Sequence, residues 1–161
     1  MDDPKRIPFR RNDRAPADRA AASPILGKPA RTERVRIVIA DDDPMSLDEL
    51  GNLLEAQFDT VGRAENGKRL IECVQKLQPA VVVTDLSMPE MNGIEAARHI
   101  TKAYPNVKVV ILSVHCDPAF VEAAFEAGAL GYVVKLEAGT DLIPAIEDVV
   151  AGRPHRPRGL A

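Results

Sequence analysis

The stretch Ala80-Val81-Val82-Val83-Thr84-Asp85-Leu86-Ser87-Met88-Pro89 decides the fold. It opens with a continuous apolar run, which is typical of a strand buried on both faces of a parallel sheet. The run ends at Asp85, and a loop with the turn-forming pair Asn92-Gly93 follows. Open α/β sheets carry their chemistry at the carboxyl ends of their strands. Asp85 is therefore the first candidate functional residue.

Other apolar runs end in polar residues in the same way. Residues 36–40 lead into Asp41-Asp42-Asp43, residues 107–112 into Ser113, and residues 130–134 into Lys135. With a less apolar run at 60–64, these strands recur every twenty-odd residues, about the length that a right-handed βαβ crossover needs. The pattern predicts an α/β fold, a doubly wound five-stranded parallel sheet with the weak second strand at an edge.

Helical periodicity fills the intervals between the strands. Apolar residues recur there at three- and four-residue spacing, which predicts five helices with one face toward the sheet. The residues that mark their starts are Pro44, Asn66-Gly67, Gly93, Pro118 and Thr140. We expect Thr140 to be the N-cap of the last helix, with Asp141 in its first turn.

Composition divides the chain into three parts. Residues 1–34 hold five prolines and a net charge of +4 without apolar periodicity, and we predict a disordered basic leader. Residues 35–152 form the predicted folded domain, and residues 153–161 are Pro/Arg-rich and resemble a linker. Cys73 and Cys116 lack metal-site spacing and are expected to be reduced thiols. No stretch has the length of a membrane span, so we expect a soluble, cytoplasmic protein.

The carboxylates after the first strand need a cation or open water, because adjacent acids repel one another. Hard oxygen ligands suit Mg²⁺, whereas the alternative is a solvated acidic turn that caps the helix at Pro44. Asp85 on the neighbouring strand adds a third oxygen source, and a carboxylate can attack phosphorus to form an acyl phosphate. Lys135 and Ser113 could then hold phosphoryl oxygens, although each could equally be an ordinary loop residue.

These motifs together resemble a response-regulator receiver domain, CheY-like and closest in style to the receivers of LuxR-type transcription regulators. The residues that carry the resemblance are Asp41 and Asp42, the segment Thr84-Asp85-Leu86-Ser87-Met88-Pro89 with Asn92-Gly93, Ser113, and Gly131-Tyr132-Val133-Val134-Lys135. The resemblance implies a flavodoxin-like sheet of strand order 2-1-3-4-5. It covers almost the whole predicted domain.

The resemblance also implies a role for each site residue. Asp85 would accept a phosphoryl group from a sensor histidine kinase or a phosphotransfer protein. Mg²⁺ would be bound by Asp41, Asp42, Asp85 and the backbone carbonyl of Ser87. Lys135 and Ser113 would hold the phosphoryl group, and Ser113 and Tyr132 would act as the switch. The receiver would catalyse only its own phosphorylation and dephosphorylation.

Switching in such a domain would repack the surface made by the fourth helix, the fifth strand and the fifth helix, through which homodimers are expected. Before phosphorylation, Tyr132 is expected to be a half-buried ring with its hydroxyl in water. Val114 is larger than the small residue usual at its position, so we predict narrower access to the phosphoryl site. Leu136 stands where many receivers have proline.

Two other functions remain open at this point. One is a pseudo-receiver that binds partners without phosphorylation. The other is a haloacid-dehalogenase-like phosphatase, which expects an Asp where this chain has Ser87. The sequence contains no recognition helix, so DNA binding is expected only if an output domain is missing from this chain. The chain is then either a truncated transcription factor or a stand-alone receiver.

Overall fold

A parallel five-stranded sheet forms the centre of the computed structural model, which describes residues 34–159. The predicted leader, up to residue 33, lies outside the described residues. In spatial order the strands are β3 (Asp59–Ala64), β2 (Arg36–Ala40), β4 (Val81–Asp85), β5 (Lys108–Ser113) and β6 (Gly131–Val134). This is the order 2-1-3-4-5 along the chain. The predicted doubly wound sheet is confirmed, and its least buried strand, β3, lies at an edge.

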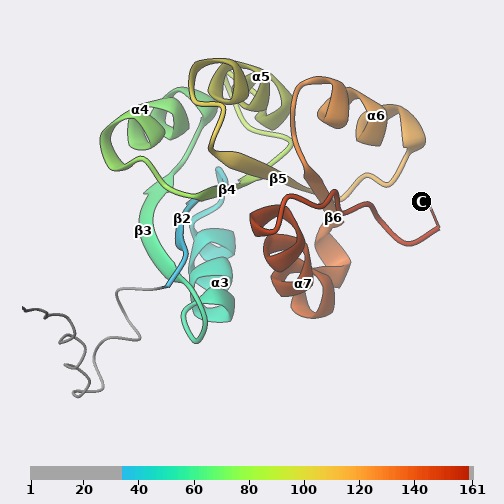
Figure 1. Cartoon of the computed structure of the whole chain (residues 1–161), viewed down its shortest axis with the longest axis horizontal. Helices are drawn as coiled ribbons and strands as arrows, with labels where there is room; N and C mark the ends of the chain where they lie inside the picture. Colours follow the sequence, from blue (N-terminus) through green and yellow to red (C-terminus); the bar gives the residue numbers. More distant parts are fainter. Residues whose placement is uncertain (1–33, 160–161) are drawn as a thin grey trace, which may run out of the picture. The chain divides into compact units, whose positions relative to one another are not determined.

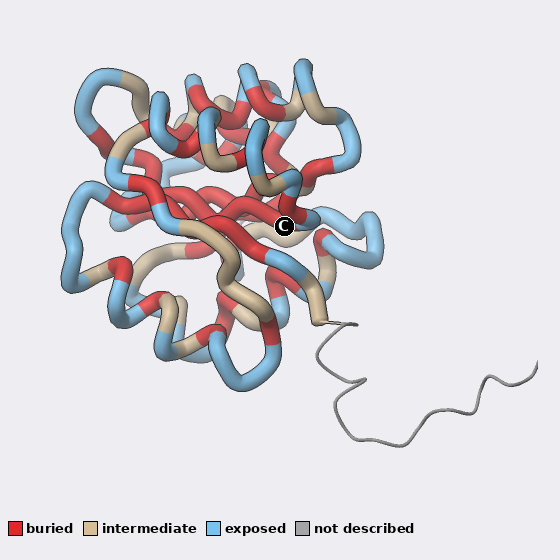
Figure 2. Tube along the Cα trace, turned by 90° about the vertical axis from the view of Figure 1, so that its left-hand side faces the viewer, coloured by how far each residue is buried: buried red, intermediate tan, exposed pale blue. Residues whose placement is uncertain are grey.

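Helices cover both faces of the sheet (Figure 1). One layer consists of α4 (Gly67–Leu77), α5 (Gly93–Ala103) and α6 (Pro118–Glu126), and the other of α3 (Pro44–Leu54) and α7 (Ala138–Val150). Successive strand residues point to opposite layers, because side chains alternate along a strand. Val38 packs toward α4, α5 and α6, whereas Ile37 and Ile39 pack toward α3 and α7. Figure 2 shows the consequence, a buried sheet between helices whose outer turns are exposed.

The helices begin where the sequence offers caps. Asp43 accepts a hydrogen bond from the Met45 amide at the start of α3, and Asn66 accepts one from the Arg69 amide at the start of α4. α5 begins with a capping box that the sequence analysis did not identify, in which Asn92 and Glu95 each accept a backbone N–H from the other.

The predicted start of the last helix is wrong. Thr140 lies inside α7, which begins at Ala138 after a short 3₁₀ helix, η3 (Lys135–Glu137). The Thr140 hydroxyl donates to the Glu137 carbonyl at 3.3 Å instead of capping an amide. The 3₁₀ turn continues almost directly from β6 into α7, so the helix needs no side-chain cap at Thr140.

Two further expectations concern thiols and membrane segments. Cys73 and Cys116 are free cysteines. Among residues 34–159, no helix combines the length and the apolar character that crossing a membrane requires.

Candidate functional site

Carboxylates from two neighbouring strands meet at the carboxyl edge of the sheet. Asp41 and Asp42 follow β2, and Asp85 is the last residue of β4. These three acids bring one carboxylate oxygen each within 4.8 Å of one another. Asp41 and Asp85 are buried, while Asp42 is exposed. The two strand ends thus assemble a small, acidic, partly desolvated site.

Backbone contacts fix the two buried acids. The Asp41 amide donates to the Ala64 carbonyl of β3, and Asp41 Oδ1 accepts from the Asp43 amide at 2.9 Å. Gly93, at the start of α5, packs directly on the end of β4, where a Cβ would collide with the backbone carbonyl oxygen of Asp85. A glycine at this position therefore lets the loop after Asp85 turn tightly into the helix.

Lys135 reaches the acidic site from the end of β6. Its Nζ lies 2.8 Å from Asp41 Oδ2 and 3.5 Å from Asp85 Oδ1. The shorter contact is the hydrogen bond to Asp41, so Lys135 neutralises the buried acid of β2 more closely than it does Asp85. The long stem of lysine lets an ammonium at one strand end serve acids on two others.

The electrostatics of Asp85 follow from this surrounding. Burial raises the pKa of Asp85 to about 6, and the negative charge of Asp41 adds to this effect, while Lys135 opposes it. For Lys135, burial alone would lower the pKa, but the hydrogen bond to Asp41 and the charge of Asp85 raise it overall. The site therefore holds more negative charge than its single lysine balances.

That imbalance is the observation that fits a divalent cation. Three carboxylates offer hard oxygen ligands, one of them at an exposed position where water could complete the coordination shell. Asp43 caps α3 instead, because its two carboxylate oxygens accept hydrogen bonds from the Met45 amide and the Ser46 hydroxyl. Ser87 is exposed in the loop after β4. The participation of its carbonyl stays a prediction.

A loop backbone joins the two expected switch residues. The hydroxyl of Ser113, a buried residue at the end of β5, accepts from the His115 amide at 3.0 Å. The Tyr132 hydroxyl donates to the carbonyl of the same His115 at 2.8 Å. The His115 side chain is exposed and stacks on Phe120, with ring centroids 4.7 Å apart.

The predicted burial of Tyr132 is wrong. We expected a half-buried ring with its hydroxyl in water, but Tyr132 is fully buried. Its hydroxyl finds a carbonyl acceptor in the loop, so the ring can be buried without an unsatisfied polar group. No sequence pattern pointed to His115 here, because it is the backbone of this residue that makes both bonds.

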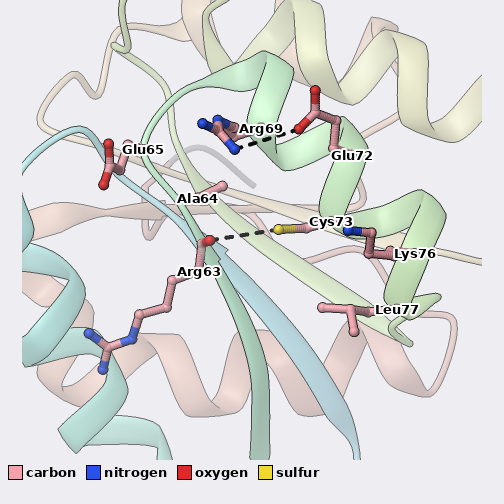
Figure 3. A pocket seen from close by; sticks show the side chains of 8 residues that line it. All are labelled: Arg63, Ala64, Glu65, Arg69, Glu72, Cys73, Lys76 and Leu77. Carbon is pink, nitrogen blue, oxygen red and sulfur yellow. Dashed lines mark hydrogen bonds and ion pairs between the residues drawn. The ribbon is translucent and has the colours of Figure 1, made fainter.

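One pocket lies away from the acidic site. It has a volume of about 360 Å³ and is lined by residues of β3, α4 and the turn between them (Figure 3). Two of its arginines are engaged within the chain, since Arg69 lies near Glu72 and Arg63 binds Asp48. The pocket mixes acidic and basic side chains and shares no residue with the site around Asp85.

The chain matches the model of the response regulator receiver domain over residues 37–147. It is 34% identical over 129 residues to the transcriptional regulatory protein DegU of Brevibacillus brevis, covering 79% of this chain and 55% of DegU. It is also 34% identical to the chemotaxis protein CheY of Thermotoga maritima, covering 71% of this chain and 96% of CheY.

A similar solved structure is that of a two-component response regulator of the LuxR family from Aurantimonas sp. SI85-9A1. Its TM-score is 0.76 at 33% identity, over 80% of this chain and 93% of that one. The chain spans about half the length of DegU, the first of its curated relatives, and nearly all of CheY. The family model, over residues 37–147, covers residues of all five strands and of both helical layers, and it includes Asp41, Asp42 and Asp85. The chain therefore belongs to the receiver domains of two-component response regulators.

Proposed function

We propose that Asp85 is the phosphoacceptor of this receiver, taking a phosphoryl group from a phosphohistidine of a sensor histidine kinase or a phosphotransfer protein. The observation that carries this proposal is the group of three carboxylates within 4.8 Å, with the Lys135 ammonium in contact with two of them. Asp85 is the member that lies at the end of the central strand β4, between the strand that leads to Asp41 and the strand that leads to Lys135.

The reaction exchanges one phosphorus bond for another. A carboxylate oxygen of Asp85 forms a bond to phosphorus while the N–P bond of the phosphohistidine breaks. The departing imidazole nitrogen keeps the bonding electron pair and takes up a proton from solvent. The product is an acyl phosphate, and its hydrolysis by water later returns the carboxylate and releases inorganic phosphate. The receiver thus acts only on itself, as a signalling phosphoacceptor.

Mg²⁺ fits the site as the cofactor, held by Asp41, Asp42 and Asp85 with the Ser87 carbonyl as a further ligand. When bound, it would neutralise charge on the transferring phosphoryl oxygens. The chain's own residues do the rest. Lys135 offers an ammonium next to Asp85, and Asp41 anchors that ammonium at 2.8 Å. Ser113 offers a hydroxyl at the end of the adjacent strand.

Switching would begin at Ser113. Its hydroxyl oxygen accepts from the His115 amide, and its O–H would donate to a phosphoryl oxygen on Asp85, which would draw the side chain toward that group. Movement of Ser113 would displace His115, whose carbonyl holds the Tyr132 hydroxyl. A local charge change at Asp85 would thereby bias the position of a buried aromatic ring between α6 and β6.

The phosphodonor would dock on the loops around Asp85. Large apolar side chains are exposed there, each directly beside or near a site residue in the sequence, namely Met45, Val114 and Leu136. Leu136 is 94% exposed although it follows Lys135 directly. Exposed apolar side chains near a charged site suit a donor whose phosphohistidine projects from an apolar helical surface.

The output is proposed to be transcriptional. DegU is a transcriptional regulatory protein, and this chain spans only 55% of its length. We propose a cytoplasmic receiver that forms homodimers through α6, β6 and α7 and that acts on DNA only if the protein also carries an output domain. The corresponding test compares the mass of the protein in solution with and without phosphorylation, which reports the fraction of dimer.

The phosphoacceptor proposal is tested by intact mass spectrometry after incubation with Mg²⁺ and acetyl phosphate or a phosphorylated kinase. One phosphoryl group should be added, and it should be absent in Asp85→Asn and in the presence of a chelator. Asp43→Asn is the matched control, because Asp43 caps α3 and Asn is also a good cap. This variant should keep the adduct.

Other outcomes point to other functions. A chain that takes up no phosphoryl group from either donor would be a receiver that binds partners without phosphorylation. Sustained hydrolysis of an aryl phosphate, with turnover many times the amount of protein, would favour the phosphatase alternative. An adduct that persists in Asp85→Asn would place the acceptor at another residue.

A further inference from the structure

Residues 153–157 of the Pro/Arg-rich tail pack on the domain. Figure 1 shows the chain after α7 running beside β6. The His155 amide donates to the Leu130 carbonyl at 2.9 Å, and the Tyr132 amide donates to the His155 carbonyl at 2.8 Å. These two bonds form a parallel bridge between His155 and Gly131, so the tail covers the outer edge of β6.

Each ring nitrogen of His155 lies within hydrogen-bond distance of a carboxylate of α7. Its Nδ1 lies 2.8 Å from Asp148 Oδ2, and its Nε2 lies 3.0 Å from Asp141 Oδ1. The two acids are seven residues apart, two helical turns, and so lie on one face of α7. The His155 side chain is only 14% exposed and that of Asp141 only 9%.

This geometry requires a proton on each bond. A neutral imidazole donates from one nitrogen only, whereas an imidazolium donates from both. Asp148 is a carboxylate here, since the hydrogen bonds from His155 and Arg153 lower its pKa. Asp141 Oδ2 is buried without a hydrogen-bond partner, which makes a cation at Oδ1 the natural compensation for its charge.

Other contacts extend the tail from α7 across to α6. Arg153 binds Asp148 at 2.9 Å, and Arg156 binds Glu122 of α6 at 3.0 Å. The Arg156 guanidinium also lies 4.2 Å from the centre of the Phe125 ring, and Pro157 is buried. Residues 153–157 therefore touch α7, β6 and α6 in turn. We call this segment the strap.

We propose that the strap is a proton-gated cover of the α6, β6 and α7 surface. It is closed while an imidazolium at His155 bridges Asp141 and Asp148, and it opens when that ring becomes neutral. Opening frees the Leu130 carbonyl and the Tyr132 amide at the outer edge of β6.

The charged groups around the ring set the direction of this response. α7 contributes the acids Asp141 and Asp148, the strap contributes Arg153 and Arg156, and α6 contributes Glu122, which Arg156 engages. On β6 the titratable side chain is Tyr132, whose hydroxyl is bonded to His115. Each ring nitrogen faces one of these acids, and a neutral ring can donate to only one of them. Alkaline conditions therefore open the strap.

The test is NMR on the full chain across the pH range in which imidazoles titrate. The ring nitrogens of His155 should both carry protons when the strap is closed. Protection of the Tyr132 and His155 amides from hydrogen exchange should fall together as the ring deprotonates. In His155→Ala we expect a loss of protection of about tenfold or more at these amides, at every pH. Amides of the central strand β4 should not change.

His99→Ala is the matched control, because His99 is an exposed histidine on α5, away from the strap. It should leave both amides protected. His155→Gln separates shape from charge: glutamine can keep one bond but not both, so protection should be weak and independent of pH. Unchanged protection in His155→Ala would refute the proposal that the His155 side chain holds the strap on the edge of β6. A neutral His155 ring in the closed state would overturn the gate, because a proton on Asp141 would then complete the bond.

Discussion

Asp85→Asn should make the protein more stable at neutral pH when Mg²⁺ is absent. The pKa of this carboxyl rises from 3.8 to about 6 on folding, chiefly through burial and the neighbouring charge of Asp41. The folded chain therefore binds the proton more tightly than the unfolded chain does. The contribution of Asp85 to stability is fully present below the unfolded pKa and is lost as pH rises through the folded one.

The magnitude follows from the size of this shift. A rise of roughly two pH units corresponds to at most about 3 kcal/mol, at about 1.4 kcal/mol per unit. The Asp85 side chain is 10% exposed, but the site opens to water on the side of Asp42, and water weakens the electrostatic effect. We therefore expect a pH-dependent contribution of about 2 kcal/mol to the free energy of unfolding. Asparagine has nearly the same shape and no charge at either pH. The stability of Asp85→Asn relative to the natural chain should thus grow by about 2 kcal/mol between about pH 4 and about pH 7.5.

The assay is urea denaturation followed by circular dichroism at both pH values, with a chelator present. Comparing the two pH values cancels every effect of the substitution that does not depend on protonation. Ser87→Ala serves as the control, because it alters the same loop without removing an ionisable group. The reasoning is refuted if the stability difference of Asp85→Asn is the same at both pH values, or if it shrinks as pH rises. Added Mg²⁺ should stabilise the natural chain more than the variant, because only the natural chain keeps all three carboxylates.

Three further predictions concern residues around the site. Val114→Ala should react faster with acetyl phosphate than the natural chain, because a smaller side chain beside Ser113 opens access to Asp85. Equal or slower labelling, followed by intact mass, would contradict this. Tyr132→Phe should lower the free energy of unfolding by about 1–2 kcal/mol, because the buried hydroxyl loses its bond to His115 and leaves that carbonyl without its donor. A fully stable Phe variant in urea denaturation would show that the bond contributes little. Gly93→Ala should destabilise the domain by about 1–3 kcal/mol and weaken Mg²⁺ binding, since the added Cβ meets the Asp85 carbonyl oxygen and must shift the end of β4. Calorimetry of Mg²⁺ binding to Gly93→Ala at a temperature where it is folded would check the second effect, and unchanged affinity would contradict it.

The sequence predicted most of the fold because the relevant signals are local. Continuous apolar runs such as Val81-Val82-Val83 identify buried parallel strands, and the acids and lysine at their ends must then meet at one edge. Helix starts were predictable where a capping residue stands beside a proline or glycine, as at Asp43-Pro44 and Asn66-Gly67. Thr140 failed as a cap because a 3₁₀ turn, which has no clear sequence signal, leads into α7 before it.

The features that sequence reasoning missed depend on backbone atoms or on distant partners. The bonds of the His115 amide and carbonyl carry no residue-type signal. The clasp of His155 joins residues in different elements, and a Pro/Arg-rich composition indicates a linker unless the acids of α7 are known to face it. That Lys135 lies closer to Asp41 than to Asp85 carries no sequence signal either, because the two acids are of the same residue type.

Tyr132 forms hydrogen bonds both to the loop after Ser113 and to the strap, but through different atoms. A change at one contact therefore need not alter the other. Its hydroxyl binds the loop that begins at Ser113, whereas its amide binds the strap. Rotation of the ring about its side-chain bonds breaks the first contact and leaves the amide in the sheet, because the backbone of β6 does not turn with the ring. A signal at Asp85 that only rotates Tyr132 would therefore leave the strap closed. If both proposals hold, phosphorylation and the charge on His155 would act as two separate controls on the surface of α6, β6 and α7, because they reach Tyr132 through different atoms.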